Sequence, residues 1–391
     1  MKFVLMILSF LLAFCAYAKE LSAVDKSLLV FDMIKMNLFP RDGVDMSTVL
    51  SSLSLQKGFK ITLYAADVKG ARSLALGDNG VVFVGSRDVG KVYAILPKTK
   101  AHAKKVIVIA ENLNIPNGVG YIDGDLYVAE NQRILKFKKV MAQLSTGKVR
   151  AKVIYDKLPS ELYHGWRYLT VGPDKKLYVS IGAPCNICLK KNKRFASILR
   201  VNRDGKHPQI IAHGVRNSLG LAFHPTTDRL WFTDNGRDWL GDSLPPDELN
   251  VLTAIGQNFG FPFVYGDNHP DIFYKQRPTV QLIEPNYLLK AHVSPLGLRF
   301  YDKESYPSGY QGNLFVALHG SWNSTKKVGY KIKRFVLDEQ TIVIAEDFVW
   351  GWLKGNEVLG RPVDLLVMPD GSMLISDDYN GVIYRVAYEM K

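Results

Sequence analysis

Short apolar segments separated by turns fill most of the chain, and one two-strand unit recurs among them. The unit is an apolar strand, a short turn with Gly, Asp or Pro, and a second strand that reads apolar-aromatic-apolar and ends in polar residues. Short apolar runs bounded by such turn residues are typical of β-strands. Six copies begin at Ser73, Gly118, Leu169, Gly220, Leu296 and Val363. Third strands follow most copies at hairpin distance, at Lys91, Ile134, Ser197 and Val382.

This repetition predicts an all-β fold, a six-bladed β-propeller of four-stranded antiparallel blades. A β-sandwich also has frequent short strands, but it does not repeat one two-strand unit six times. The propeller is expected over residues 51–391, after an N-terminal extension at 19–50. The segment from about residue 237 to 295 is rich in Pro, Asn, Gly and aromatic residues, and we expect an elaborated loop on one face there.

The first eighteen residues predict a signal peptide. Lys2 is followed by an apolar run at 3–16 and by the small-x-small sequence Ala16-Tyr17-Ala18. A membrane anchor is the alternative, but the run is short for a span and the chain turns polar directly after it. We therefore expect cleavage near Ala18, a periplasmic or secreted protein, and no membrane span in the mature chain.

Composition and charge narrow the class of protein. The chain has 391 residues, 47% of them hydrophobic, which excludes a disordered protein. Its 50 Lys and Arg outnumber 37 Asp and Glu, for a formal charge of +13. The basic residues are spread out rather than clustered with aromatic ones, so nucleic acid is not the expected partner. The charge favours attraction to acidic surfaces or acidic redox partners.

Two cysteines, Cys185 and Cys188, remain after removal of the leader. In an oxidising compartment this spacing most simply gives a local disulfide. A redox-active pair would need a helix start after a βαβ pattern, and a c-type haem would need His where Leu189 stands. A zinc site would need a second pair of ligands, which the sequence lacks at suitable spacing.

Polar and charged residues stand just before first strands or just after second strands of the unit, positions that face one mouth of a propeller channel. They are His164, Arg216, Asn217, the runs 234–238 and 319–323, and Arg361. Taken singly, each has an ordinary explanation, since a loop histidine is mostly solvated and Asp-Asn-Gly is a common turn. Equivalent positions in different blades share one face, so together they predict a functional site.

These motifs resemble the soluble quinoprotein glucose/sorbosone dehydrogenases, most closely the sorbosone dehydrogenase-like branch of aldose sugar dehydrogenases. The resemblance covers the chain from about residue 55 onward. It rests on long strings: His164 with Gly172-Pro-Asp174, Gly214-Val-Arg-Asn217, Phe232-Thr-Asp-Asn-Gly-Arg-Asp-Trp239, Pro245-Pro-Asp-Glu-Leu-Asn250, Phe259-Gly-Phe-Pro262, His319-Gly-Ser-Trp-Asn323 and Gly360-Arg-Pro-Val-Asp364.

The resemblance implies an oxidoreductase that holds pyrroloquinoline quinone (PQQ) and calcium over the channel. Such enzymes oxidise the C1 hydroxyl of an aldose, or a hydrated aldehyde, by hydride transfer to the quinone while a base takes the proton. His164 matches the family's catalytic base. Arg216 matches the arginine that stabilises charge on the quinone oxygen, and Asn217 is expected to bind the same region.

The family match also implies how the cofactors are held. The backbone carbonyls of Gly236 and Arg237 would bind calcium, a hard ion that prefers oxygen ligands. Arg361 would bind a cofactor carboxylate, and Lys327 would provide a second cationic contact with the cofactor. Val363 stands where the glucose-specific branch has another cofactor-binding arginine, and Arg87 could compensate for it.

His319 and Trp322 are expected to line the sugar pocket, or else to pack the loop that carries them. The reduced cofactor would pass electrons to a separate acceptor, a cytochrome or a quinone.

Two other functions remain open at this point. A calcium-dependent six-bladed lactonase would use metal-bound side chains such as Glu130, Asn217 and Asp364 with an activated water, but would leave His164 and Arg361 unexplained. A non-catalytic binding propeller is compatible with the fold, but has no reason to gather a histidine and two arginines at one mouth.

Overall fold

The computed structural model describes residues 45–274 and 278–389. The predicted signal peptide and most of the predicted extension at 19–50 lie outside the described residues. Among those residues, no helix is long and apolar enough to cross a membrane.

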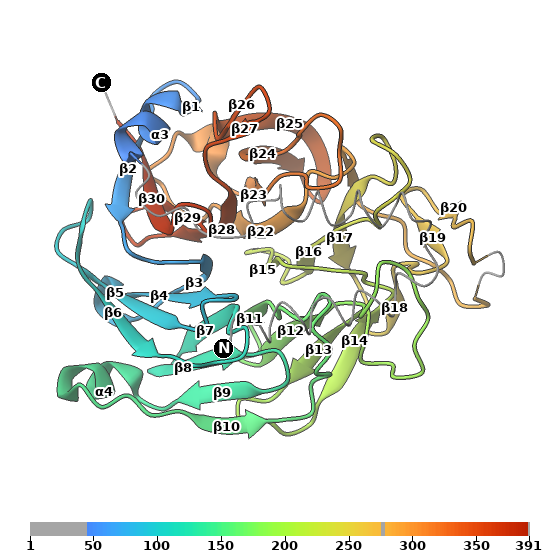
Figure 1. Cartoon of the computed structure of the whole chain (residues 1–391), viewed down its shortest axis with the longest axis horizontal. Helices are drawn as coiled ribbons and strands as arrows, with labels where there is room; N and C mark the ends of the chain where they lie inside the picture. The colour runs from blue at the N-terminus through green and yellow to red at the C-terminus, as the bar shows by residue number, and fades with distance from the viewer. Residues whose placement is uncertain (1–44, 275–277, 390–391) are drawn as a thin grey trace, which may run out of the picture. The chain divides into compact units, whose positions relative to one another are not determined.

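The strands form six sheets arranged in a ring (Figure 1). The first blade is β3 (Ala71–Leu76), β4 (Val82–Ser86), β5 (Val92–Pro97) and β6 (Ala103–Ala110). The second blade is β7 (Gly118–Ile122), β8 (Asp125–Ala129), β9 (Ile134–Phe137) and β10 (Lys152–Tyr155). The third is β11 (Leu169–Val171), β12 (Leu177–Ile181), β13 (Ser197–Val201) and β14 (Gln209–His213), with β18 (Gln257–Asn258) added at its edge.

The fourth blade is β15 (Leu221–Phe223), β16 (Leu230–Asp234), β17 (Asp247–Leu252) and β21 (Tyr287–Leu289). The fifth is β22 (Pro295–Phe300), β23 (Leu314–Leu318), β24 (Lys331–Asp338) and β25 (Thr341–Trp350), with β1 (Ser54–Leu55) at its edge. The sixth is β28 (Pro362–Val367), β29 (Met373–Asp377), β30 (Val382–Tyr388) and β2 (Phe59–Ala65).

Short elements complete the fold. Two small hairpins pair β19 (Val264–Tyr265) with β20 (His269–Pro270), and β26 (Leu353–Lys354) with β27 (Glu357–Val358). Within residues 45–274 and 278–389 the helices are α3 (Met46–Ser52) and α4 (Val140–Thr146), with 3-10 turns η2 (Asp78–Gly80) and η3 (Ser308–Tyr310). Helix α3 spans the expected domain boundary and buries Val49 in the core that also contains Val349 of β25.

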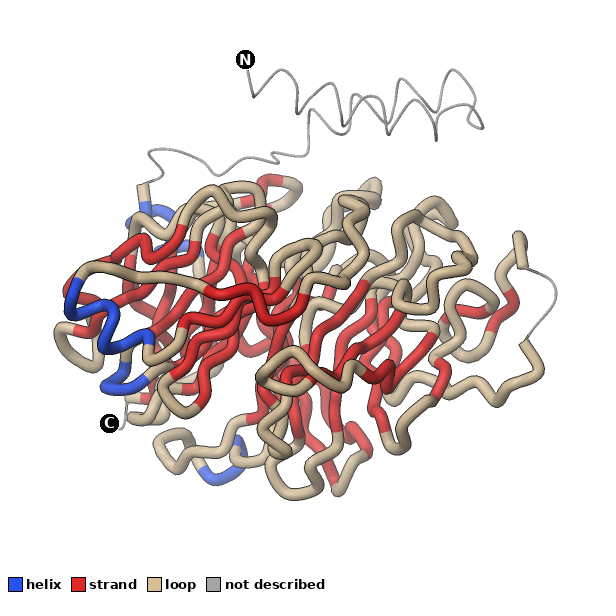
Figure 2. The backbone as a smooth tube through the Cα atoms, turned by 90° about the horizontal axis from the view of Figure 1, so that it is seen from below, coloured by secondary structure: helices blue, strands red, loops and turns tan. Residues whose placement is uncertain are grey.

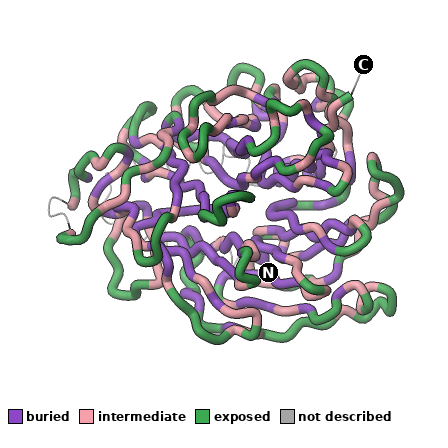
Figure 3. The backbone as a smooth tube through the Cα atoms, turned by 180° about the vertical axis from the view of Figure 1, so that it is seen from behind, coloured by how far each residue is buried: buried purple, intermediate pink, exposed green. Residues whose placement is uncertain are grey.

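The first strands of the six blades contact one another in cyclic order, from β3 through β7, β11, β15, β22 and β28 back to β3. These strands therefore line the central channel. The ring closes because β2, from the N-terminal side, pairs antiparallel with β30 near the C-terminus, with Phe59 opposite Tyr388. Figure 2 shows the strands of the blades from below, and Figure 3 shows that the buried backbone lies mainly in the blades.

Every first and second strand of the repeated unit forms as the sequence predicts, and the six-bladed propeller is confirmed. The segment 237–295 differs from the expected loop, because it contains β17 and β21, two strands of the fourth blade. Strand β17 has no continuous apolar pattern in the sequence, because three of its buried residues are polar or charged: Asp247, Glu248 and Asn250.

The channel is apolar where four of its side chains meet. Leu219, Leu296 and Val363 form a small buried cluster, and Trp166 packs against it. They come from the starts of different blades, so they meet near the axis. Val363 therefore has a packing role at the position where the sequence comparison noted a missing arginine.

Candidate active site

His164 lies in the loop before β11, and the backbone there is left-handed, with φ of +50°. Its side chain is buried, and Nδ1 donates to the carbonyl oxygen of Ala183 at 2.9 Å. Because a carbonyl can only accept, Nδ1 carries the proton and Nε2 is an acceptor. Nε2 makes no hydrogen bond to any described residue. Burial, and then the charges of Arg216 and Arg167, hold the pKa of His164 well below its ordinary value, so the ring is neutral.

Asn217 faces His164 across Gly182 of the following loop. A Cβ on Gly182 would lie 2.5 Å from the Cβ of His164 and 3.3 Å from Oδ1 of Asn217, so only glycine allows this approach. The backbone amide of Asn217 donates to Asp234 at 2.6 Å, which fixes the residue at the end of β16. The structure thus brings two of the predicted site residues together.

Arg216 is buried and held on several sides. Nε donates to the carbonyl oxygen of Asn186 at 2.9 Å, and Nη1 to that of Asn235 at 3.0 Å. Nη2 donates to Oδ1 of Asn186 at 2.9 Å and lies 3.4 Å from a carboxylate oxygen of Asp238. These bonds leave the guanidinium little freedom, so its charge is at a fixed place close to His164.

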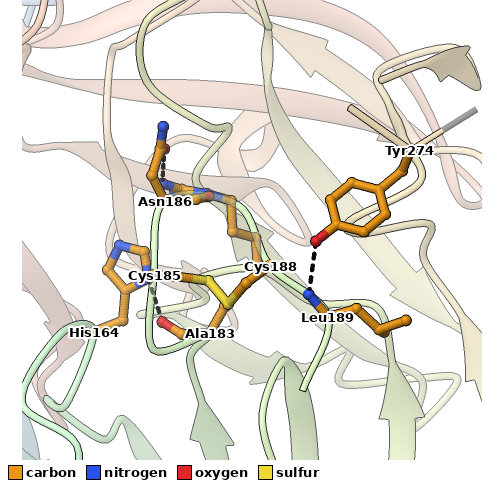
Figure 4. Close-up of a disulfide and its surroundings, with 8 residues drawn as sticks. His164, Ala183, Cys185, Asn186, Cys188, Leu189 and Tyr274 are labelled. Carbon is orange, nitrogen blue, oxygen red and sulfur yellow. Dashed lines mark hydrogen bonds between the residues drawn. A yellow bond between two sulfur atoms is a disulfide. The ribbon is translucent and has the colours of Figure 1, made fainter. Parts of the chain in front are cut away.

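Asn186 lies in the loop closed by the disulfide between Cys185 and Cys188 (Figure 4). The same loop contains Ala183, whose carbonyl oxygen accepts from His164. One short loop between β12 and β13 therefore contacts both of the predicted catalytic side chains. The sequence predicts the disulfide but not a role for Asn186. Its position between the two cysteines, in a loop that the disulfide fixes, was the signal that could have identified it.

The loop after β16 presents Gly236 and Arg237. The amide of Gly236 donates to Asp247 at 2.8 Å, and the guanidinium of Arg237 binds both carboxylate oxygens of Asp271, at 2.8 and 3.0 Å. The carbonyl oxygens of both residues accept no hydrogen bond from the described part of the chain. Both carbonyl oxygens are therefore free to act as metal ligands, and a hard cation such as calcium prefers oxygen ligands.

No group of three or more His, Cys, Asp or Glu side chains among the described residues could hold a metal ion. Two of the three side chains that a lactonase would use, Glu130 and Asp364, are engaged in other contacts. Glu130 is paired with Arg133 and accepts from the amide of Asn114, while Asp364 is bound by the amides of Leu74 and Leu365.

A second cluster surrounds Asp378, just after β29. Its carboxylate oxygens lie 3.0 Å from Nε of Arg361, 2.9 Å from Nη1 of Arg72 and 3.1 Å from Nε2 of His319. Burial opposes ionisation, but the charges of Arg361 and Arg72 and the hydrogen bond with His319 hold the pKa of Asp378 well below its ordinary value. Sequence reasoning missed Asp378 and Arg72, although Asp378 ends a second strand just as the 234–238 run does.

Lys327 has no carboxylate partner among the described residues, and Arg361 is paired with Asp378 through Nε alone. The ammonium of Lys327 and the two terminal nitrogens of Arg361 make no hydrogen bonds to described residues. Burial, and then the charge of Arg361, lower the pKa of Lys327, so the two cations lie close to each other. Such a pair suits an anionic group such as a carboxylate.

Arg87 lies over the indole of Trp166, 4.9 Å from the ring centroid, and the same indole is 6.0 Å from the ring of His164. The guanidinium of Arg87 forms an ion pair with the exposed carboxylate of Asp88. Trp322 stands elsewhere on the rim, edge to face with Trp239 at 5.5 Å. His319 and Trp322 thus have different surroundings: the former is tied to Asp378, the latter is exposed.

The fold and these side chains define a six-bladed propeller whose channel mouth holds a neutral histidine among several cations, most of them fixed by hydrogen bonds or ion pairs. The sequence profile of the glucose/sorbosone dehydrogenases matches residues 126–385. An uncharacterised protein of Borreliella burgdorferi is 36% identical over 87% of this chain and 92% of its own length. The chain belongs to the glucose/sorbosone dehydrogenase family.

More distant relatives and solved structures agree with this family. An aldose sugar dehydrogenase of Escherichia coli is 25% identical over 30% of each chain. The holo PQQ domain of a pyranose dehydrogenase from Coprinopsis cinerea has a TM-score of 0.72 at 16% identity, covering 86% of this chain and 97% of that one. The PQQ-bound aldose sugar dehydrogenase from Streptomyces coelicolor has a TM-score of 0.62 at 17% identity, covering 85% and 99%. These structures share the fold.

Proposed function

We propose that this protein is a PQQ- and calcium-dependent sugar dehydrogenase that oxidises the C1 hydroxyl, or hydrated aldehyde, of an aldose or sorbosone-like sugar. The observation that carries the proposal is the neutral, buried His164, whose Nε2 is unpaired beside the fixed charge of Arg216. A base and a fixed cation side by side are what removal of a hydroxyl proton during oxidation requires.

The chain offers suitable partners for both cofactors. PQQ is a planar quinone with three carboxylates, and Lys327, Arg361 and Arg87 supply cations at the mouth. The free carbonyl oxygens of Gly236 and Arg237 are the proposed calcium ligands. Their side chains contribute nothing to that role, because Gly236 has none and that of Arg237 is bound to Asp271.

The residues act by holding groups and moving one proton. Nε2 of His164 takes the proton of the sugar hydroxyl, while Ala183 holds the ring in the required tautomer through Nδ1. When bound, PQQ supplies the two-electron oxidant for the C1–H bond. Arg216 holds a positive charge where negative charge accumulates, and Asn217 offers its amide to the same region. His319 and Trp322 border the space left for the sugar.

The location of the protein and its electron acceptor are parts of the same proposal. The leader sequence and the Cys185–Cys188 disulfide suit the periplasm or the exterior of the cell. Electrons then leave to a separate cytochrome or quinone, and the excess of basic residues favours an acidic partner.

The first test is an absorbance titration of calcium-loaded protein with PQQ, followed by a panel of aldoses with a dye acceptor. We expect saturable binding and sugar-dependent bleaching of the dye. Absence of PQQ binding would contradict the proposal and would redirect the assay to lactone hydrolysis.

A further inference from the structure

Arg167 is a fully buried arginine that forms no ion pair with any carboxylate in the part of the chain that the structure describes. It is 0% exposed, and burial lowers its pKa from 12.5 to about 10, only partly opposed by the charge of Glu161. The guanidinium is therefore charged at neutral pH. A buried guanidinium is ordinarily paired with a carboxylate, because an unpaired buried charge is costly. The contacts of this guanidinium indicate what it does instead.

The guanidinium of Arg167 donates to three backbone carbonyl oxygens. Nε donates to Asn131 at 2.9 Å, Nη1 to His164 at 3.1 Å and Nη2 to Pro159 at 2.7 Å. Buried carbonyl groups need a donor, and these three belong to residues outside the strands. One side chain therefore ties the loop at 156–168, which carries the candidate base, to the turn after β8.

Asn131 holds the same loop with its side chain. Nδ2 donates to the carbonyl oxygens of Glu161 and Gly165, each at 3.0 Å. A Cβ on Gly165 would lie 2.4 Å from that nitrogen, so glycine allows the amide to come this close. His164 stands between these two contacts in the chain, and its backbone is left-handed, a conformation that persists in such a residue only where the surroundings impose it. The donors of Asn131 and Arg167 supply that constraint.

The backbone of Arg167 is fixed as well. Nδ2 of Asn117 donates to the carbonyl oxygen of Arg167 at 2.9 Å, and Oδ1 of Asn117 accepts from Nε of Arg72 at 3.0 Å. Arg72 in turn pairs with Asp378 at 2.9 Å. All three members of this chain, Arg72, Asn117 and Arg167, are buried. A buried series of hydrogen bonds thus joins the cluster around Asp378 to the loop of His164.

We propose that Arg167 is a positioning residue for His164. Its guanidinium holds the backbone of His164 so that Nδ1 reaches the carbonyl oxygen of Ala183 and Nε2 is left as the acceptor. The inference deepens the proposed function and rests on it, since the placement of Nε2 matters only where His164 is the base. The cation acts in the same direction: after burial and the charge of Arg216, the charge of Arg167 lowers the pKa of His164.

The test is the tautomer of His164 in isotope-labelled apoprotein, read from nitrogen–proton NMR correlations and assigned through His164→Gln. The wild type should show one tautomer, with the proton on Nδ1, because the carbonyl of Ala183 can only accept. Arg167→Met removes all three donors, and we expect both tautomers to be present. Arg167→Lys keeps a cation but lacks the planar fork that reaches three carbonyl oxygens, so it separates position from charge and should also show both.

Arg334→Met is the matched control. Arg334 of β24 also makes several hydrogen bonds, among them to Glu346 at 2.7 Å and to the carbonyl oxygen of Gly309. Its loss should lower Tm but leave the tautomer of His164 unchanged. A single Nδ1 tautomer in either folded variant of Arg167 would overturn the inference, and so would a mixture of tautomers in Arg334→Met.

Steady-state kinetics of the holoenzyme give a second readout. Arg167→Lys should lower kcat by about a hundredfold, the effect of a small displacement of a catalytic group, with little change in KM for the sugar. Arg334→Met should change neither. A higher KM with kcat retained would contradict a positioning role, because it would mean that Arg167 serves only the binding of the sugar.

The two proposals can fail separately, because the NMR measurement needs neither PQQ nor sugar. If the wild type oxidises no sugar, the dehydrogenase is overturned and the tautomer still decides the role of Arg167. If the wild type oxidises sugars and the variants of Arg167 keep the single tautomer, the dehydrogenase stands and the positioning role is overturned.

Discussion

His164 is a histidine that the fold keeps neutral, with one nitrogen bound and the other open. Its bond to Ala183 selects the tautomer, and burial removes the charged form at neutral pH. A solvated histidine would be partly protonated near its ordinary pKa and to that extent unable to accept a proton. Under the proposed function, the neutral ring of His164 would therefore be available as a base at neutral pH.

His164→Gln should lower kcat by about a hundredfold to ten-thousandfold, because positioned general bases contribute that much. PQQ affinity should change little, since the proposed carboxylate contacts lie elsewhere. Dye-linked steady-state assays and the absorbance titration measure the two quantities. His102→Ala, at an exposed position, is the control. Loss of binding with kcat retained would contradict the role as a base.

The pH dependence of stability follows from a second histidine. Burial lowers the pKa of His319 from 6.5 to about 4, only partly opposed by Asp378. Below pH 6.5 the unfolded chain binds a proton that the folded one does not, so this residue costs stability as pH falls toward 4. His319→Gln should therefore reduce the fall in Tm between pH 6.5 and 4, measured by calorimetry. An identical fall in the variant would contradict this assignment.

At the scale of the elements, the predictable strands are those with an unbroken apolar pattern. Second strands such as β4 and β8 bury nearly every side chain, so their hydrophobic runs are visible in the sequence. Strand β17 was missed because its buried carboxyl and amide groups resemble a loop. The hydrogen bonds that allow this burial, such as Asp247 with the amides of Gly236 and Ser294, join residues far apart in sequence.

The same distinction applies to the candidate site. His164, Arg216 and Arg361 were predicted because they precede or follow recognisable strands. Asn186 and Asp378 act through contacts with residues 30 and 17 positions away, which the repeat does not encode. The family resemblance predicted roles for these residues, but their hydrogen-bond and ion-pair partners could be identified only from the folded structure.

The Gly236–Arg237 loop gives a prediction at this scale. Calcium added to chelator-treated protein should raise Tm, since a ligand that binds only the folded state stabilises it by about 2.7 kcal/mol at a hundredfold excess over Kd. Gly236→Ala should weaken the effect, because its Cβ would lie 2.9 Å from both Pro245 and Pro246 and displace the loop. Magnesium is the control ion. No response to calcium by calorimetry would contradict the site.

At the scale of the whole molecule, one pair of strands closes the ring. Strand β2 joins β30 although more than three hundred residues separate them, so the sixth blade is complete only when both ends of the propeller meet. Separation of this pair would expose the edge of β30 and the core between the last and first blades.

A bond across this closure should stabilise the entire ring. Lys60 faces Ala387 in the register of β2 and β30, so Lys60→Cys with Ala387→Cys can be oxidised to a disulfide. We expect about 2–4 kcal/mol of added stability in denaturant unfolding, lost again on reduction. Each single variant is a control. A fully formed bond, verified by mass, without such a gain would contradict the expected stabilisation by this closure.

The apolar cluster of Leu219, Leu296 and Val363 with Trp166 has a kinetic consequence. Its buried members come from the starts of three blades, so we expect the cluster to close the channel at that level. Under the proposed function, sugar, oxidised product and electron acceptor would then use one entrance, and the product would have to leave before the acceptor approaches. Parallel double-reciprocal plots, the sign of a substituted-enzyme mechanism, are the expected result of a steady-state assay.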